Sequence, residues 1–220
     1  MDSITVALMG WAHWLEYGVT LLLAALLVSV VLRRGAFSVM SMRMWWCISV
    51  GWQVFFATVI TIAQYRMWNA NDITRELITT PLGEEVPRMI IHAPISLFLD
   101  GRGGYYVFYA YTHFWVSLLL SAFGALVFYG FFRVLQRRKP VAVGHEEVLL
   151  VSGMAFLTGW PNMIAFISLA FVFAVADTLW AHIRKGAAAR TRMLRSVIFA
   201  AITTLLLSAK VAAYTALLTV

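Results

Sequence analysis

The sequence predicts an all-α polytopic membrane protein, a six-helix transmembrane bundle with one mixed-charge segment outside the membrane. Of its 220 residues, 62% are hydrophobic and only 12% are charged, so the chain has more apolar surface than a soluble domain of this size could bury. The charged residues lie almost entirely between long apolar runs. Lysine and arginine gather in every second loop, which is typical of loops on the cytoplasmic side of a membrane protein.

The first predicted span covers about residues 10–32. Residues 17–32 are uniformly apolar, whereas the residues before them are less apolar and include Trp11, His13, Trp14 and Glu16. Tryptophans of this kind mark the headgroup region, so the span enters the lipid near them. An acid precedes the apolar run and two arginines follow it, which is the reverse of the order in a secretory signal peptide. We therefore expect a retained span.

The second span is predicted at residues 44–63, followed by an outer segment at residues 64–104. The outer segment mixes acids, arginines, prolines and glycines and is the one extramembrane stretch of any size. Residues 89–99 within it are apolar, but they are only about half the ~20 residues needed to cross the hydrocarbon, and Pro94 stands in their middle. This stretch is therefore expected to lie in the membrane interface or to enter the membrane partway as a re-entrant element.

The remaining four spans are predicted at residues 105–132, 146–160, 162–183 and 196–218. The third opens with clustered tyrosines and phenylalanines, which indicate an aromatic girdle at the membrane surface. The fourth and fifth form a hairpin, because Pro161 lacks a backbone donor while Gly159 and Asn162 tolerate turn geometry. The whole chain is thus read as a single transmembrane domain.

The basic loops predict the orientation of these spans. The loops after spans one, three and five contain three, four and five Lys and Arg residues: Arg33, Arg34 and Arg43; Arg133, Arg137, Arg138 and Lys139; Arg184, Lys185, Arg190, Arg192 and Arg195. They are expected to face the cytoplasm, which places both termini and the outer segment on the outer side of an inner membrane. The same loops account for the net charge of +7. We therefore expect the lipid bilayer and other membrane subunits as partners, and no nucleic acid.

Polar residues within apolar runs are the first candidates for function. Lys210 lies about 21 Å along the last span from Ser196, toward the outer face. Glu16 is predicted at a similar depth, so the two could form an ion pair between the first and last spans, or Lys210 could extend to the interface. The functional alternative is a substrate or proton site built from Lys210, Glu16 and His113.

Two carboxylates are candidates for catalysis. Glu147 lies fourteen residues before Pro161 and Asp177 sixteen residues after it, so an antiparallel hairpin brings them to similar depth near the cytoplasmic face. Two acids at one level can support general acid–base or aspartyl chemistry. The structural alternative, which we favour, places Glu147 at the positive end of its helix dipole and Asp177 against a basic residue or a neighbouring span.

Residues 144–161, GHEEVLLVSGMAFLTGWP, resemble a stretch of the type IV prepilin peptidases, in which a Gly-x-Gly-Asp motif opens a span that ends in a Gly-Trp or similar turn. The resemblance implies that Glu147 stands at the position of the catalytic aspartate, and six spans would suit that family. His145 and Glu146 replace the middle residues of the motif, and the family's Ile-Pro-Asn motif with its aspartate is missing. The resemblance covers 18 of 220 residues, so it implies at most a degenerate relative without peptidase activity.

Histidines on the predicted outer side offer a metal hypothesis. His13, His92 and His113 could converge there, and Glu16 lies three residues from His13. However, no His-x-x-x-His or His-Glu-x-x-His spacing occurs. We therefore expect ordinary interfacial histidines and no metal or other cofactor. The single cysteine, Cys47, excludes an intrachain disulfide.

Nucleotide and hydrolase motifs are also missing, since the chain has no Walker A loop, no dinucleotide-binding glycine pattern and no Gly-x-Ser-x-Gly elbow. The leading hypothesis is a non-catalytic subunit or assembly factor of a larger inner-membrane machine of the secretion, conjugation or pilus type, and not an enzyme. The alternative is a small-molecule transporter or substrate-binding membrane component. A degenerate protein similar to the prepilin peptidases is the third.

Overall fold

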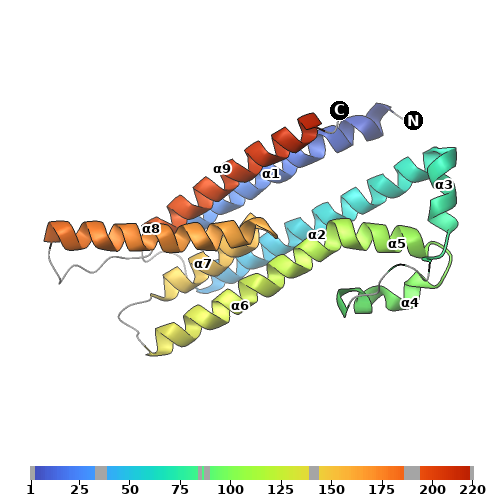
Figure 1. Cartoon of the computed structure of the whole chain (residues 1–220). Coiled ribbons are helices and arrows are strands. Elements are labelled where there is room, and N and C mark those ends of the chain that lie inside the picture. The colour runs from blue at the N-terminus through green and yellow to red at the C-terminus, as the bar shows by residue number, and fades with distance from the viewer. Residues whose placement is uncertain are drawn as a thin grey trace. The chain divides into compact units, whose positions relative to one another are not determined.

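The fold is all-helical throughout the part of the chain that the computed structural model describes, which is residues 3–32, 39–83, 86, 90–138, 144–185 and 194–218 (Figure 1). Within these residues, three helices are long and apolar enough to cross a membrane: Met44–Ala70, Gly104–Arg138 and Asn162–Arg184. Three shorter apolar helices correspond to the other expected spans: Trp14–Ser29, Glu147–Thr158 and Arg195–Ser208. The predicted helical class is confirmed with three candidate spans, while the six-helix transmembrane bundle stays a prediction.

The chain divides into two compact units. Unit 1 comprises Met1–Gly18 and Val50–Leu119, and unit 2 comprises Val19–Ser49 and Leu120–Val220. The divisions fall inside three helices, which are α1 (Ser3–Leu32), α2 (Val39–Ala70) and α6 (Val116–Arg138).

Unit 1 contains the end of α2 and most of the predicted outer segment. The α2 helix continues seven residues past residue 63, where the second span was expected to end. Between α2 and α6, unit 1 consists of short elements: α3 (Asp72–Thr79), the 3-10 helix η1 (Ile90–Ile95), α4 (Ser96–Leu99), α5 (Gly104–Ala110) and the π-helical η2 (Tyr111–Trp115). The unit also includes the first half of α1. Helix α3 starts at a cap, because the Asn71 side chain accepts a hydrogen bond from the backbone N–H of Ile73 at 3.1 Å.

Unit 2 is organised around α7 (His145–Thr158), which packs against α8 (Asn162–Lys185) and α9 (Leu194–Leu218). Every side chain from Leu150 to Thr158 is buried. A helix that is apolar on all sides needs cover on all of them, from neighbouring helices or from lipid. The 14 residues of α7 measure about 21 Å, which is shorter than the ~30 Å of hydrocarbon. Burial inside unit 2 therefore accounts for the composition of residues 146–160 without a full membrane crossing.

The chain reverses between α7 and α8 at the position where the sequence predicts a turn. Gly159 adopts φ +69°, a conformation that L side chains rarely adopt. The backbone N–H of Trp160 donates a hydrogen bond to Ser121 Oγ on α6 at 2.7 Å. This bond ties the turn to a neighbouring helix of the same unit.

Candidate functional site

Unit 1 contains a cluster of aromatic side chains that joins α2 to α5. We call it the aromatic clamp: Tyr65, Trp68, Tyr105, Tyr106 and Tyr109. The Trp68 ring lies 4.7 Å from Tyr109, 5.6 Å from Tyr106 and 6.2 Å from Tyr105, measured between ring centroids. Trp68 is only 8% exposed. The residues that the sequence predicts as a girdle therefore also hold two helices together, by ring contacts of the offset and edge-to-face kinds.

Polar groups beside the clamp are paired through Thr61 of α2. The Tyr106 hydroxyl donates to the backbone carbonyl of Thr61, and Trp115 Nε1 donates to Thr61 Oγ1 at 3.2 Å. Thr61 Oγ1 in turn donates to the carbonyl of Ala57 at 2.7 Å. These bonds fix α2 against both α5 and η2, because partly buried polar groups are costly when unpaired.

Residues 90–99 fold back alongside α5, and we call them the fold-back segment. One end of the segment is fixed because Leu82 N–H donates a hydrogen bond to the carbonyl of Leu99 at 3.1 Å, and Thr80, two residues before Leu82, accepts a hydrogen bond from Tyr105 N–H of α5 at 3.2 Å. Further along, the His92 ring lies 4.8 Å from that of Phe108. The segment is therefore antiparallel to α5.

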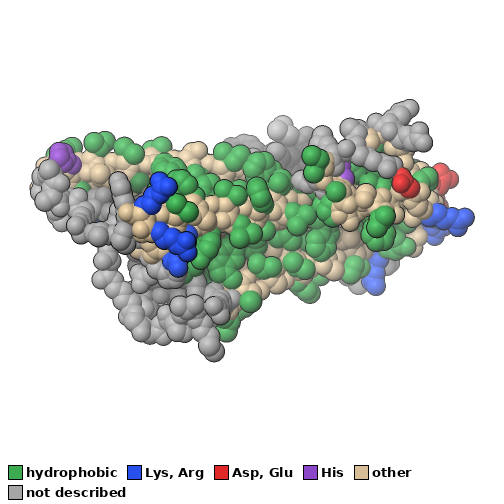
Figure 2. All heavy atoms as spheres, turned by 90° about the horizontal axis from the view of Figure 1, so that it is seen from below, with side chains coloured by type: hydrophobic (Ala, Val, Ile, Leu, Met, Phe, Trp, Pro, Cys, Tyr) green, Lys and Arg blue, Asp and Glu red, His purple; other side chains and the backbone are tan. Residues whose placement is uncertain are grey.

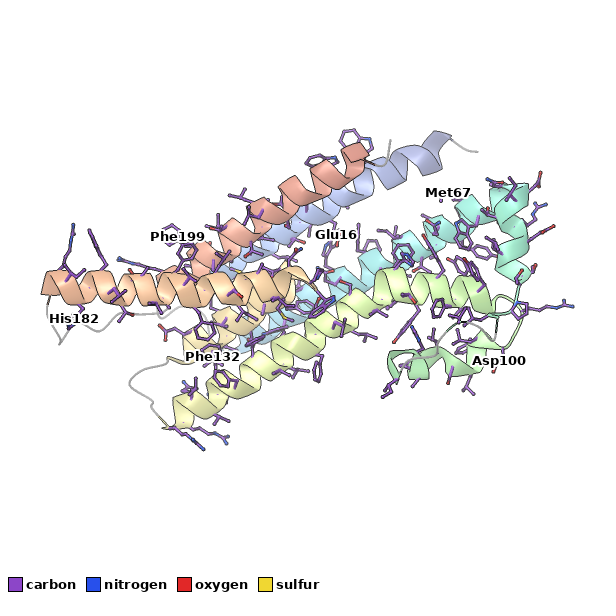
Figure 3. The ribbon with its side chains drawn as sticks, in the orientation of Figure 1. Glu16, Met67, Asp100, Phe132, His182 and Phe199 are labelled. Atoms are coloured by element: carbon purple, nitrogen blue, oxygen red, sulfur yellow. The ribbon has the colours of Figure 1, made fainter. Side chains whose placement is uncertain are left out.

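A tight turn between α4 and α5 permits this arrangement. Gly103 adopts φ +86°, and a Cβ at Gly104 would lie 1.9 Å from the carbonyl oxygen of Leu99. Any side chain at Gly104 would therefore push the fold-back segment away from α5. Asp100 marks this turn in Figure 3.

The two faces of the fold-back segment differ in burial. His92 is 7% exposed and Leu99 is fully buried. On the outward face, Ile90 is 94%, Leu97 90% and Phe98 62% exposed. No Asp, Glu, Lys or Arg occurs among residues 90–99. The exposed surface of the segment is thus uncharged and mostly apolar, with Ser96 as an exposed polar residue.

Helix α3 presents a different surface, in which apolar and charged side chains alternate. Ile73 and Leu77 lie one turn apart on the same side of the helix. Ile73 is exposed, whereas Leu77 and Ile78 are half-buried. Ile73 is 81% exposed, and Asp72 and Arg75 beside it form an exposed ion pair at 3.7 Å. Figure 2 shows red acidic side chains close to blue basic ones near the right-hand edge of the view.

The predicted metal ligands do not come together among the described side chains. His92 lies against Phe108, whereas His113 is exposed, stacks on Tyr109 at 4.1 Å and has Nδ1 2.9 Å from the Tyr109 carbonyl oxygen. The side chain of His13 lies outside the described residues. Within the described part of the chain, no three His, Cys, Asp or Glu residues are grouped as a metal ion would require.

Glu147 occupies the first turn of α7. Its carboxylate Oε2 accepts a hydrogen bond from the backbone N–H of Gly144 at 2.9 Å, and the residue is 8% exposed. This contact is the helix-terminus role that the sequence favours over catalysis. Asp177 is partly exposed on α8, in the same unit. A catalytic pair of Glu147 and Asp177 stays a prediction.

The three predicted binding residues lie on different elements. Glu16 is on α1 and is partly buried (Figure 3), and His113 is in η2. Lys210 falls within α9, but its side chain lies outside the described residues. The Glu16–Lys210 ion pair and a site shared with His113 therefore stay predictions.

Several features of both units escape sequence reasoning. The hydroxyls of Ser49, Ser196 and Thr204 are buried in unit 2 without a hydrogen-bond partner among the described atoms, although each residue looks ordinary in its apolar run. The clamp residue Trp68 also lies beyond the predicted end of its span. Trp68 lies one helical turn after Tyr65, and this spacing is the sequence feature that could have indicated an aromatic cluster on one face of α2.

Unit 1 offers the contact surfaces of α3 and the fold-back segment, and unit 2 contains a closely packed helical core. A hollow in unit 2 is lined only by apolar side chains of α6, α7, α8 and α9, among them Phe132 (Figure 3) and Phe166, and so provides no group for acid–base chemistry. No known protein family, no curated protein and no solved structure matches the chain.

Proposed function

We propose that this protein is a non-catalytic subunit or assembly factor of a larger inner-membrane complex, and that α3 is the surface that contacts its partner. The observation that carries the proposal is Ile73 on α3, which is 81% exposed, whereas Leu77 one turn further along is half-buried. Helix α3 also packs against α5, but Ile73 stays uncovered within the described part of the chain, and an exposed apolar side chain on an amphipathic helix is suited to burial against a partner.

The length of α2 supports an aqueous position for α3. The candidate span Met44–Ala70 has 27 residues, about 40 Å of helix, whereas the hydrocarbon is ~30 Å thick. With its N-terminal end at the basic cytoplasmic loop, about 10 Å of α2 extends beyond the hydrocarbon on the other side. Helix α3 follows directly, and its charged side chains are compatible with water.

The charges around Ile73 indicate the chemistry of the partner. Asp72, Arg75 and Glu76 are all exposed, so a partner surface needs an apolar centre with polar groups of both signs around it. This composition fits a protein–protein interface with an apolar core and a polar rim. A membrane subunit with its own outer domain is therefore the proposed partner class.

The non-catalytic part of the proposal draws support from Glu147. Its carboxylate is engaged with the backbone N–H of Gly144, which explains an acid at this position without any reaction. We further propose, from the basic loops, six spans with both termini on the outer side.

Co-purification tests this function. The full chain extracted from its native membrane in mild detergent is expected to retain a stoichiometric partner, and Ile73→Asn is expected to release it because the apolar centre is lost. Thr79→Asn, on the same helix and also exposed, serves as the matched control and should retain the partner. A monodisperse lone protein, or a partner retained equally by both variants, would overturn the proposal.

A further inference from the structure

We propose that the fold-back segment, residues 90–99, lies flat in the interfacial layer of the bilayer, with Ile90, Leu97 and Phe98 inserted at the boundary between headgroups and acyl chains. The ligand of this surface is the lipid itself. The inference concerns a surface separate from α3 and goes beyond the proposed function.

The length of the candidate span Gly104–Arg138 indicates the depth in the bilayer at which the fold-back segment lies. Its 35 residues form about 52 Å of helix, and fitting them into ~30 Å would require a tilt of about 55°, beyond the usual limit of about 40°. Part of this helix therefore extends out of the hydrocarbon.

The basic end of the same helix identifies the part that extends. Arg133, Arg137 and Arg138 belong at the cytoplasmic interface. Counting ~20 residues back from Arg133 along the helix reaches His113 at the opposite edge of the hydrocarbon. Residues 104–112 therefore lie in the outer interfacial layer.

The contacts of the fold-back segment place it at this same level. The carbonyl of Leu99 lies beside Gly104 at the start of α5. The ring of His92 lies 4.8 Å from that of Phe108 and 6.3 Å from that of Tyr111, measured between ring centroids. The residues that these side chains contact on the neighbouring helix thus all precede His113 in the chain. The segment accordingly runs beside the interfacial part of the helix and not beside its hydrocarbon part.

Composition selects lipid over a protein partner for this face. Helix α3 surrounds its exposed Ile73 with charged side chains, whereas no charged residue occurs among residues 90–99. Leu97 and Phe98 come shortly before Gly104, where the apolar helix of the candidate span begins. Asp100 and Arg102 are exposed in the turn between them. An uncharged, mostly apolar surface at this level inserts about 5–10 Å into the interface.

Environment-sensitive labelling in lipid nanodiscs tests the proposal. In a Cys47→Ser background, which removes the single free cysteine, the full chain carries either Leu97→Cys or the exposed control Thr79→Cys, each labelled with the fluorophore NBD. The nanodiscs contain phosphatidylcholine with a nitroxide at acyl carbon 5 or carbon 12. Ile90→Cys, at a position that is 94% exposed, replaces Leu97→Cys if the latter does not fold.

The expected result is blue-shifted emission at position 97, with at least twofold stronger quenching by the carbon-5 nitroxide than by the carbon-12 nitroxide. Position 79 should emit as in water and be at least threefold more accessible to iodide. Equal iodide access at positions 97 and 79 would overturn the proposal. So would stronger quenching by carbon 12, which indicates a re-entrant element, or a blue shift that appears only when another protein is added. Release of a partner by Ile73→Asn is a separate readout, so this proposal can fail while the proposed function stands.

Discussion

Glu147 lies at the N-terminal end of α7 and caps the helix, although its sequence context is also compatible with catalysis. Glu147 is 8% exposed and accepts the Gly144 N–H at 2.9 Å. At this position the carboxylate meets both an otherwise unpaired donor and the positive end of the helix dipole. A buried acid in a membrane protein can therefore be explained by local backbone chemistry.

Substitution of Glu147 distinguishes the two roles. We expect Glu147→Gln to keep most of the stability, because the amide oxygen still accepts the Gly144 N–H, and Glu147→Ala to lower the free energy of unfolding by about 1–2 kcal/mol. Unfolding in detergent followed by circular dichroism measures both. Glu147→Gln and Asp177→Asn proteins that fold normally but lose a measurable hydrolysis would refute the non-catalytic assignment and support acid–base chemistry by these two carboxylates.

At the scale of the element, α7 depends on close approach by its neighbours. A Cβ at Gly153 would lie 2.8 Å from Leu27 Cδ2 and 3.0 Å from Trp45 Cη2. Trp45 has little freedom to move, because its Nε1 donates to the carbonyl of Leu23 at 3.1 Å. The middle of α7 therefore needs glycine, because a side chain at position 153 would occupy the space of Leu27 and Trp45.

Gly153→Leu is expected to destabilise the protein by about 3 kcal/mol or more, since the added atoms have no space in the core of unit 2. Gly130→Leu on α6 is the matched control, because a Cβ there meets nothing within 4 Å. It should be neutral or stabilise by up to about 0.8 kcal/mol through better helix propensity. Thermal unfolding of the two variants in the same detergent measures the difference, and equal midpoints would show that α7 is not enclosed as described.

At the scale of the whole molecule, the distribution of charge predicts one side for every basic loop. Cysteines introduced at Arg137 and Arg190 in the Cys47→Ser background should react with a membrane-impermeant thiol reagent only from the cytoplasmic side, and one at Thr79 only from the outer side. The reason is that basic loops resist translocation. Reaction of positions 137 and 190 from opposite sides would exclude the six-span topology and the levels derived from it.

The sequence by itself determined the helical class, the apolar runs and the turn near Pro161, because each depends on local composition and backbone chemistry. Tertiary structure decided that residues 90–99 fold back on α5, that Trp68 joins α2 to α5, and that α7 is enclosed. The contacts of His92 with Phe108 illustrate the physical reason. Hydropathy records how apolar a segment is, whereas the faces that meet depend on packing between segments distant in the chain.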